Sequence, residues 1–324
     1  MRLTMASLCL LLCLFASLAC LGWKTEAQGF GINYGQIGNN LPSPNHVLSL
    51  LNSLNVTRVK LYDADPKVLL AFSDTDVEFI VGIANDALKD MSNLEAAQQW
   101  IQQHVQQFLP RTKITCILVG NEVFKSSPQF LPFLLPAMQT IYTALTNLGL
   151  NKQVTVSSAH SVDELSVSYP PSSGAFRGDI TQYMQPLLNF HSQIRSPFLI
   201  NAYPFFAYKE NPKEIPIEYV LFEPNEGMVD PKTKLVYSNM LYAQIDAVYS
   251  AIKALGHTDV QIRVSETGWP SKGDVDEVGA SKVNAGLYNR NLLKRVLAKQ
   301  TTPGKPSMAI DVHVFALFNE DLKP

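Results

Sequence analysis

Cysteine is scarce in this chain outside its first residues. Of the four cysteines, Cys9, Cys13 and Cys20 lie near the N-terminus, and Cys116 is the only other one. A single cysteine in the main part of the chain excludes an intrachain disulfide there, and with it the small scaffolds that disulfides hold together. Cys116 stands in the apolar run 114–119, where we expect an inert buried thiol; a nucleophilic thiol is the alternative.

An excess of basic charge is lacking too. The 26 Lys and Arg residues stand against 28 Asp and Glu, a net charge of -2, so no positive field would attract nucleic acid or anionic lipid. Segment 31–36 lacks the glycine spacing of a phosphate-binding loop, and the chain has no Walker motif. The histidines, including His160 and His313, lack metal-ligand spacing. We therefore expect no cofactor, no metal and no nucleic-acid partner.

The longest hydrophobic run lies at the N-terminus. Arg2 precedes the apolar run 8–21, which is shorter than the ~20 residues of a membrane span, and small residues follow at Thr25 and Ala27. This pattern predicts a secretory signal peptide over residues 1–27, with a signal anchor as the alternative.

The remaining chain, residues 28–324, contains a candidate modification site and no linker. The triplet Asn55-Val56-Thr57 becomes a candidate N-glycosylation site at Asn55. No Pro- or Ser-rich linker divides residues 28–324, which we expect to form one domain and a monomer.

Short apolar runs alternate with longer amphipathic stretches, the pattern of parallel strands joined by helices. The predicted strands are 30–34, 58–62, 78–84, 113–119, 154–158, 198–203, 260–264 and 309–318. Apolar spacings of three and four predict helices over 94–108, 138–148, 241–255 and 285–296. Eight such units predict an α/β fold of the (β/α)8 or TIM-barrel type, with the irregular stretch 209–236 as an excursion over one end. A doubly wound open sheet is the alternative, which the missing glycine-rich loop disfavours.

Two glutamates end predicted strands abruptly. Glu122 follows the fourth strand and Glu266 follows the seventh. Catalytic groups of such barrels stand at the C-terminal ends of strands, so both carboxyl groups are expected in one cleft. Two facing carboxylates are the equipment of glycoside hydrolysis, one as proton donor and one as nucleophile or stabilising base. The alternative is a structural glutamate paired with Arg or Lys.

The sequence around these glutamates is distinctive. The motifs Gly-Ile-Asn-Tyr-Gly at 31–35, Val-Gly-Asn-Glu at 119–122 and Val-Ser-Glu-Thr-Gly-Trp-Pro-Ser at 264–271 resemble those of the plant β-1,3-glucanase family, glycoside hydrolase family 17. Segments 201–206 and 315–320 extend the resemblance, which runs from about residue 30 to the end of the chain.

This resemblance implies a retaining endo-hydrolase of β-1,3-glucan, either callose or fungal wall glucan, secreted to the cell wall for defence or callose turnover. Glu122 would be the acid/base, with a raised pKa, and Glu266 the ionised nucleophile. Asn121 would donate to the sugar 2-hydroxyl, with a strand-end cap as the alternative. A mixed-linkage β-1,3-1,4-glucanase and a non-catalytic glucan-binding protein are the competing functions.

Aromatic residues at strand ends are further candidates for the cleft. Tyr34 and Tyr62 end the first two strands, where each hydroxyl could reach the nucleophile or each ring a sugar; packing at the barrel rim is the alternative. Tyr203, Phe205 and Phe206 end the sixth strand and are expected to stack on glucose, unless the excursion buries them.

Three residues near the C-terminal motifs complete the candidates. Trp269 is expected to pack behind Glu266. Glu320 and Lys323 match a Glu and a Lys that the resemblance places after the eighth strand to orient the substrate; a surface ion pair is the alternative. The family continues into an eighth helix, which we expect to be missing here because the chain stops at Pro324; a longer product could carry a membrane anchor or a carbohydrate-binding module.

Overall fold

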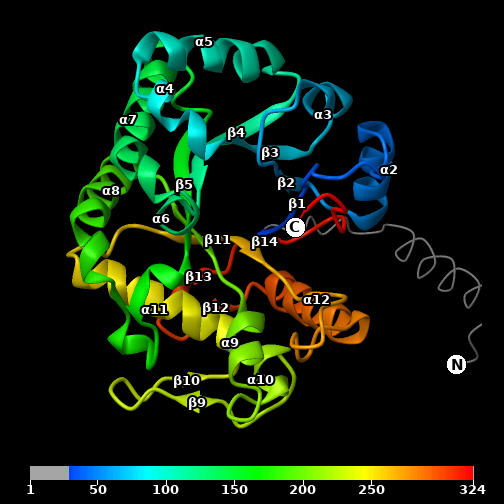
Figure 1. Cartoon of the computed structure of the whole chain (residues 1–324), viewed down its shortest axis with the longest axis vertical. Helices are drawn as coiled ribbons and strands as arrows, with labels where there is room; N and C mark the ends of the chain where they lie inside the picture. The colour runs from blue at the N-terminus through cyan, green and yellow to red at the C-terminus, as the bar shows by residue number, and fades with distance from the viewer. Residues whose placement is uncertain (1–28, 324) are drawn as a thin grey trace, which may run out of the picture.

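Eight parallel strands close into a barrel in the computed structural model, which describes residues 29–323 (Figure 1). The order around the ring is β1-β14-β11-β8-β5-β4-β3-β2. The barrel strands are β1 (Phe30–Asn33), β2 (Arg58–Lys60), β3 (Glu78–Ile83), β4 (Lys113–Asn121), β5 (Thr155–Ser161), β8 (Phe198–Asn201), β11 (Ile262–Thr267) and β14 (Val312–Val314). The closed ring confirms the predicted barrel and excludes the doubly wound open sheet. The predicted signal peptide, residues 1–27, lies outside the described residues.

Helices surround the ring and join successive strands (Figure 1). The longer ones are α2 (Pro44–Leu54), α3 (Pro66–Ala71), α5 (Leu94–His104), α7 (Leu131–Asn147), α8 (Thr181–Ile194), α9 (Pro204–Glu210), α11 (Met240–Ala254) and α12 (Lys282–Leu297). Single turns form α4 (Leu88–Met91), α6 (Val123–Ser126), α10 (Ile217–Val220) and the 3-10 helices η1 (Asn85–Ala87), η2 (Gln106–Phe108), η3 (Pro128–Phe130), η4 (Val162–Glu164), η5 (Pro171–Ser173) and η6 (Gly178–Ile180). The four predicted helices correspond to α5, α7, α11 and α12.

The ends of these helices follow from local chemistry. Asn93 caps α5 by accepting hydrogen bonds from the backbone of Glu95 and Ala96, and Ser281 caps α12 by accepting one from Asn284. Such caps satisfy amide groups that the first helical turn leaves without partners. The predicted helix 94–108 is shorter than expected, because α5 ends at His104 and only η2 follows.

The eighth barrel strand is also shorter than predicted. Residues 309–318 do not form one strand: β13 (Lys305–Ala309) pairs with β12 (Thr301–Thr302), and only β14 joins the barrel. The Phe315 amide then donates to Thr267 O and the Leu317 amide to Asn33 O, so the chain lies across the ends of β11 and β1. Within residues 315–323 the structure has no helix.

Alternation along each strand separates two layers of side chains. In the β2 region, Val59 and Leu61 are fully buried in the core between strands and helices, whereas Lys60 lies inside the barrel. A separate apolar cluster consists of Ile80, Cys116, Leu118, Ala159 and Leu199. Burial raises the pKa of the Cys116 thiol, as an inert thiol requires.

Loops after β5 and β8 build one side of the barrel mouth. The predicted excursion 209–236 contains α10 and a hairpin of β9 (Met228–Val229) and β10 (Val236–Tyr237), and the loop after β5 contains a hairpin of β6 (Leu165–Val167) and β7 (Ala175–Phe176). Asp230 joins the two loops because its carboxylate accepts hydrogen bonds from the Ser172 amide and hydroxyl, each over 2.8 Å. The excursion is therefore anchored to the rest of the mouth.

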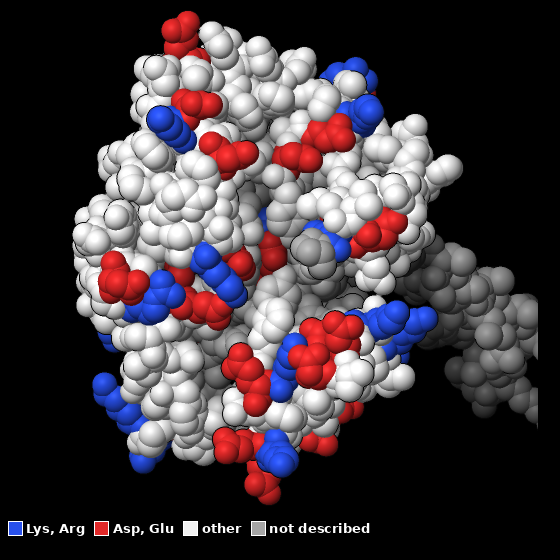
Figure 2. Space-filling model, in the orientation of Figure 1, with Lys and Arg blue, Asp and Glu red and all other residues white. Residues whose placement is uncertain are grey.

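Figure 2 shows a hollow near the centre of the face seen in Figure 1. Acidic and basic side chains are interspersed over this face, without a continuous basic patch. No helix among residues 29–323 is long and apolar enough to cross a membrane.

Candidate active site

Glu266 lies near the C-terminal end of β11 and accepts three hydrogen bonds. Lys60 Nζ and the Tyr62 hydroxyl each lie 2.7 Å from its Oε1. The Tyr203 hydroxyl donates to its Oε2 over 2.8 Å. Lys60 is fully buried and Glu266 is 6% exposed, so water contributes little to this arrangement. The carboxylate is thus held by donors from the ends of β2 and β8.

These donors determine the charge of Glu266. Burial alone would raise the pKa of its carboxyl group, but the Lys60 charge and the hydrogen bonds from Lys60, Tyr62 and Tyr203 outweigh burial and lower it. Burial and the charge of Glu266 raise the pKa of both tyrosines well above the usual value. The two hydroxyls therefore stay protonated and donate, while Glu266 stays ionised.

Glu122 follows β4 in a backbone conformation that is uncommon for a residue with a side chain. Its φ of 49° and ψ of 42° are left-handed, and it is the N-cap residue of the single turn α6. Its amide donates to Ala159 O over 2.8 Å, and its Oε1 accepts a hydrogen bond of 2.9 Å from Asn201 Nδ2. A strained backbone of this kind is frequent at functional sites.

The electrostatics of Glu122 are opposite to those of Glu266. Burial raises the pKa of its carboxyl group, and the nearby charge of Glu266 raises it further, against the hydrogen bond from Asn201. The protonated form is thus more accessible to Glu122 than to a free carboxyl group, and less accessible to Glu266. This division is the one that acid–nucleophile pairs of glycosidases need.

Asn121 connects the surroundings of the two glutamates. Its Oδ1 lies 3.3 Å from Lys60 Nζ, and its backbone amide and carbonyl bond to the side chain of Asn85 over 2.8 and 3.0 Å. Because Lys60 engages the side-chain oxygen of Asn121, the side-chain nitrogen Nδ2 of Asn121 is the donor available to another group. Asn85 fixes the backbone from which Glu122 projects.

The predicted aromatic residues range from exposed to fully buried. Phe206 is 53% exposed and its ring lies 5.5 Å from that of Tyr203, centroid to centroid. Phe205, by contrast, is buried and packs edge-on against Trp269 at 5.1 Å. Tyr34 is buried as well, and packs edge-on against Phe318. Phe206 is the most exposed ring of this group, whereas Tyr62 and Tyr203 are half-buried.

Glu320 and Lys323 form an ion pair of 2.7 Å at the same end of the barrel. The Glu320 side chain is 2% exposed, and its Oε1 accepts a hydrogen bond of 2.7 Å from the Ile37 amide. Lys323 Nζ lies 4.5 Å from the ring centroid of Phe315 and 5.8 Å from that of Tyr62. The pair is therefore more than a surface contact, because Lys323 lies near the ring of Tyr62, whose hydroxyl donates to Glu266.

Comparison with known proteins identifies the family of the chain. The model of glycosyl hydrolases family 17 matches residues 30–324. The chain belongs to this family.

The similarity to family 17 proteins extends over sequence and structure. The chain is 64% identical over 303 residues to glucan endo-1,3-beta-glucosidase 14 of Arabidopsis thaliana, covering 93% of this chain and 77% of that protein. It is 42% identical over 304 residues to glucan endo-1,3-beta-D-glucosidase of Olea europaea, covering 93% and 66%. The solved structure of CJP38, a beta-1,3-glucanase and allergen of Cryptomeria japonica pollen, superimposes with a TM-score of 0.88 at 39% identity, over 92% of both chains. The chain is therefore an enzyme of the glycoside hydrolase class.

Family 17 motifs pointed to Glu122 and Glu266, but three polar residues around them were missed. Lys60, Asn85 and Asn201 hold the glutamates or their backbone. A signal for Lys60 was present: the alternation from Arg58 to Tyr62 puts it on the same face as Tyr62. Asn201 likewise ends a buried strand two residues before Tyr203.

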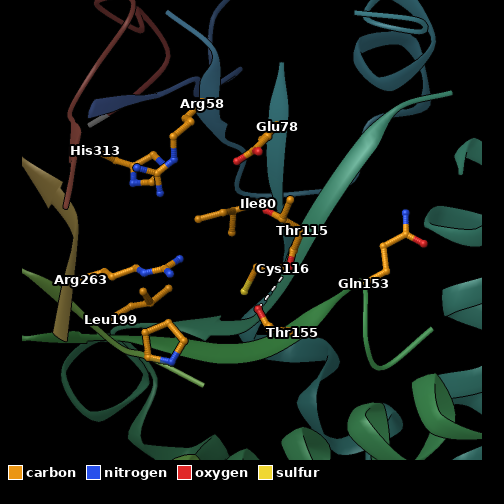
Figure 3. A pocket seen from close by; sticks show the side chains of 11 residues that line it. Arg58, Glu78, Ile80, Thr115, Cys116, Gln153, Thr155, Leu199, Arg263 and His313 are labelled. Carbon is orange, nitrogen blue, oxygen red and sulfur yellow. Dashed lines mark hydrogen bonds between the residues drawn. The ribbon is translucent and has the colours of Figure 1, made fainter. Parts of the chain in front are cut away.

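The opposite end of the family 17 barrel holds a cavity of about 250 Å³. Figure 3 shows Arg58, Arg263 and His313 on one side of it and Glu78 on the other. The two arginines share Asp311, at 2.7 and 3.4 Å, which neutralises part of their charge. Burial lowers the pKa of His313 to about 3, so its ring is neutral. This end of a barrel generally serves stability, and residues 29–323 contain no cluster of three or more metal-ligating side chains.

Proposed function

We propose that the chain is a secreted, retaining endo-glycosidase that hydrolyses the β-1,3 bonds of β-1,3-glucans. Glu122 acts as acid/base and Glu266 as nucleophile. The observation that carries the proposal is the contrast between two carboxyl groups at one barrel mouth: Lys60, Tyr62 and Tyr203 all donate to Glu266 and lower its pKa, whereas burial raises the pKa of Glu122. Two relatives from Arabidopsis thaliana, glucan endo-1,3-beta-glucosidases 14 and 11, are 64% and 53% identical to the chain and support the substrate.

The reaction proceeds in two displacements. In the first, a Glu266 oxygen forms a bond to the anomeric carbon while Glu122 gives its proton to the glycosidic oxygen, and the bond to the leaving chain breaks. In the second, Glu122 takes a proton from water, whose oxygen displaces Glu266 and restores both carboxyl groups. Lys60, Tyr62 and Tyr203 keep Glu266 ionised and oriented before attack.

Several residues around the glutamates bind the glucan in this proposal. The free amide nitrogen of Asn121 donates to the 2-hydroxyl of the reacting glucose, a contact that strengthens in the transition state. Phe206 offers an exposed ring to the apolar face of another glucose. Lys323, paired with Glu320, lies against the rings of Tyr62 and Phe315. Tyr34 is buried against Phe318 and has no contact with the glucan in this proposal. No cofactor takes part.

The location proposed for the enzyme is the cell wall, where callose or fungal wall glucan is the substrate. Cleavage of the signal peptide 1–27 would leave the catalytic domain 28–324 as a monomeric glycoprotein. Asn55 supports this view, since it is exposed at the C-cap of α2. A shift in the mass of the secreted protein after enzymatic deglycosylation, absent in Asn55→Gln, tests the modification.

The decisive experiment separates the roles of the two glutamates. Glu266→Gln should abolish labelling by a mechanism-based fluoroglucoside, with label on Glu266 in the parent enzyme. Glu122→Gln should lose hydrolysis of laminarin yet cleave a dinitrophenyl laminaribioside, whose leaving group needs little protonation. Label on another residue would contradict Glu266 as the nucleophile. Equal loss of activity on both substrates in Glu122→Gln would contradict Glu122 as the acid.

Substrate choice is measured in parallel. A solved structure described as one of two plant beta-glucan endohydrolases with distinct substrate specificities superimposes with a TM-score of 0.84 at 32% identity, so the choice of glucan is tested directly. We expect reducing-sugar release from laminarin to exceed that from barley mixed-linkage glucan. Preference for barley glucan would favour the mixed-linkage enzyme, and no release from either would favour a binding protein.

A further inference from the structure

Ser265 and Asn201 form a short chain of hydrogen bonds that ends on Glu122. The Ser265 hydroxyl donates to Asn201 Oδ1 over 2.6 Å, and Asn201 Nδ2 donates to Glu122 Oε1 over 2.9 Å. Ser265 is fully buried and Asn201 is 2% exposed, so neither side chain has water as a substitute partner. The acid/base is thus connected to the residue that precedes the nucleophile.

An irregularity in β11 allows this connection. Val264 pairs with Ile200 and Glu266 pairs with Asn201, so β11 has one extra residue, Ser265, between two consecutive residues of β8. The pairing with β14 shifts at the same place, between Val264 and Thr267. A bulge of this kind redirects side chains. Consecutive residues Ser265 and Glu266 consequently both bond to groups of the cleft, which a regular strand would place on opposite faces.

We propose that Ser265 and Asn201 are positioning residues that keep the catalytic proton of Glu122 on Oε2, the oxygen that no described residue engages by a hydrogen bond. The inference rests on the proposed role of Glu122 as acid/base. An amide has one donor end and one acceptor end. Because the Ser265 hydroxyl engages Asn201 Oδ1, the NH₂ end faces Glu122, and a carboxyl oxygen that accepts from NH₂ is disfavoured as the site of the proton.

The chain of hydrogen bonds serves both halves of the reaction. In the first step the Oε2–H bond breaks, the proton forms a bond to the leaving glycosidic oxygen, and Glu122 becomes a carboxylate. The Asn201 hydrogen bond then becomes charge-assisted and stronger, which stabilises this product of proton transfer. In the second step Oε2 takes a proton from the attacking water while Oε1 stays engaged.

Other charged groups act on Glu122 from neighbouring elements. Glu266 on β11 and Asp163 on η4 disfavour its ionised form, whereas Lys125 on α6 favours it. Tyr203, at the start of α9, stays protonated and neutral. None of these groups is altered by substituting Ser265, so a changed pH profile would report the hydrogen-bond chain itself.

The test uses Ser265→Ala, which removes only the hydroxyl. Asn201 Oδ1 then lacks a donor and can turn to accept the proton of Glu122, which favours the protonated carboxyl group and misplaces its proton. We expect the alkaline limb of kcat/KM on laminarin to move up by about one pH unit and kcat to fall about tenfold, with KM little changed. For dinitrophenyl laminaribioside kcat/KM should be unchanged, because glycosylation then needs no proton.

A matched control removes another buried hydroxyl from the barrel wall. Ser157 on β5 is fully buried and donates to Pro197 O over 2.8 Å, without contact to either glutamate. Ser157→Ala should lower the melting temperature as Ser265→Ala does, yet leave the pH profile unmoved. Ser265→Thr, which keeps a hydroxyl, should restore the parent profile; if its extra methyl group unfolds the protein, Asn201→Asp replaces it and should move the alkaline limb up further.

Two outcomes overturn the inference and differ from failure of the proposed function. Ser265→Ala with the parent pH profile, or with equal losses on laminarin and the activated substrate, would make Ser265 a structural residue only. If instead Glu122→Gln loses both substrates equally, Glu122 is not the acid, and the proposed function fails first.

Discussion

Replacing Lys60 by methionine would leave the Glu266 carboxylate without its cation. Methionine has nearly the length of lysine, so Lys60→Met removes the charge with little change in volume. The side chains of Lys60 and Glu266 are 0% and 8% exposed, and their charged atoms lie 2.7 Å apart. Solvent therefore cannot replace the lost partner, and the variant isolates the electrostatic part of the site.

The expected destabilisation is large and depends on pH. Breaking a buried ion pair typically costs about 3–5 kcal/mol, because one charge remains buried and uncompensated. In the parent the pKa of Glu266 is lowered, so its contribution to stability is present above the ordinary carboxyl pKa and is lost as the pH falls through the lowered value. In Lys60→Met burial would raise that pKa. The stability difference between the two proteins should thus be largest near pH 7 and shrink toward pH 4, where protonation relieves the variant.

Two assays measure this change. Urea midpoints between pH 4 and pH 7 give the free energy of unfolding, and kcat/KM on dinitrophenyl laminaribioside follows the nucleophile without the acid. The acid limb should move up by about two pH units or more, which is the same energy expressed as a pKa shift.

Control variants separate the ion pair from the loss of a lysine. Lys113→Met, which removes an exposed ion pair with Asp76, should cost less than about 1 kcal/mol at either pH. Adding Glu266→Gln to Lys60→Met should recover most of the lost stability, since the uncompensated charge disappears. A Lys60→Met protein equally destabilised at pH 4 and pH 7 would refute the reasoning.

Three further predictions concern the rim of the site. Phe206→Ala should weaken laminari-oligosaccharide binding by roughly 0.5–1.5 kcal/mol in calorimetry without lowering the melting temperature, whereas Phe205→Ala should lower the melting temperature; an unchanged affinity in Phe206→Ala would assign that ring to packing. Asp230→Ala should lower the free energy of unfolding by about 1–3 kcal/mol at pH 7 and expose residues 162–180 to proteolysis. The difference from the parent should fade toward pH 2, because hydrogen bonds outweigh burial and lower the pKa of Asp230 to about 2. Unaltered proteolysis would argue against an anchoring role. Gly35→Ala would place a methyl group 2.4 Å from the Glu320 carboxylate oxygens, so it should displace the pair with Lys323 and lower kcat/KM on laminarin; parent kinetics would show that the pair is dispensable.

The repeating units of the barrel were predictable because each strand and helix carries its own pattern. Eight apolar runs with amphipathic stretches between them predicted a closed ring. In the structure each barrel strand lies beside the barrel strands that precede and follow it in the chain. The boundaries were less predictable where tertiary bonds decide them. The eighth strand ends at Val314 because the next amides bond to Thr267 and Asn33 on neighbouring strands, which no local pattern announces.

The site was predictable in its two carboxyl groups and less so in what holds them. Lysine is among the residues least often buried, so a strand with Lys60 at its centre gave weak reason to place that charge inside a barrel. The bulge at Ser265 depends on the register of two neighbouring strands, and the left-handed backbone of Glu122 is uncommon for a residue other than glycine. These features exist only once distant strands meet.

The Lys60–Glu266 bond joins residues 206 positions apart, and the Ile37–Glu320 bond joins residues 283 positions apart. Contacts of such separation form late in folding, because the entropy of closing a long loop must be overcome before the contact stabilises the chain. Helices can form locally and early, while the nucleophile acquires its charge environment only when β11 and β2 take their places in one barrel. During refolding, enzymatic activity should therefore return after the helical circular dichroism signal, so the return of activity reports when the barrel assembles.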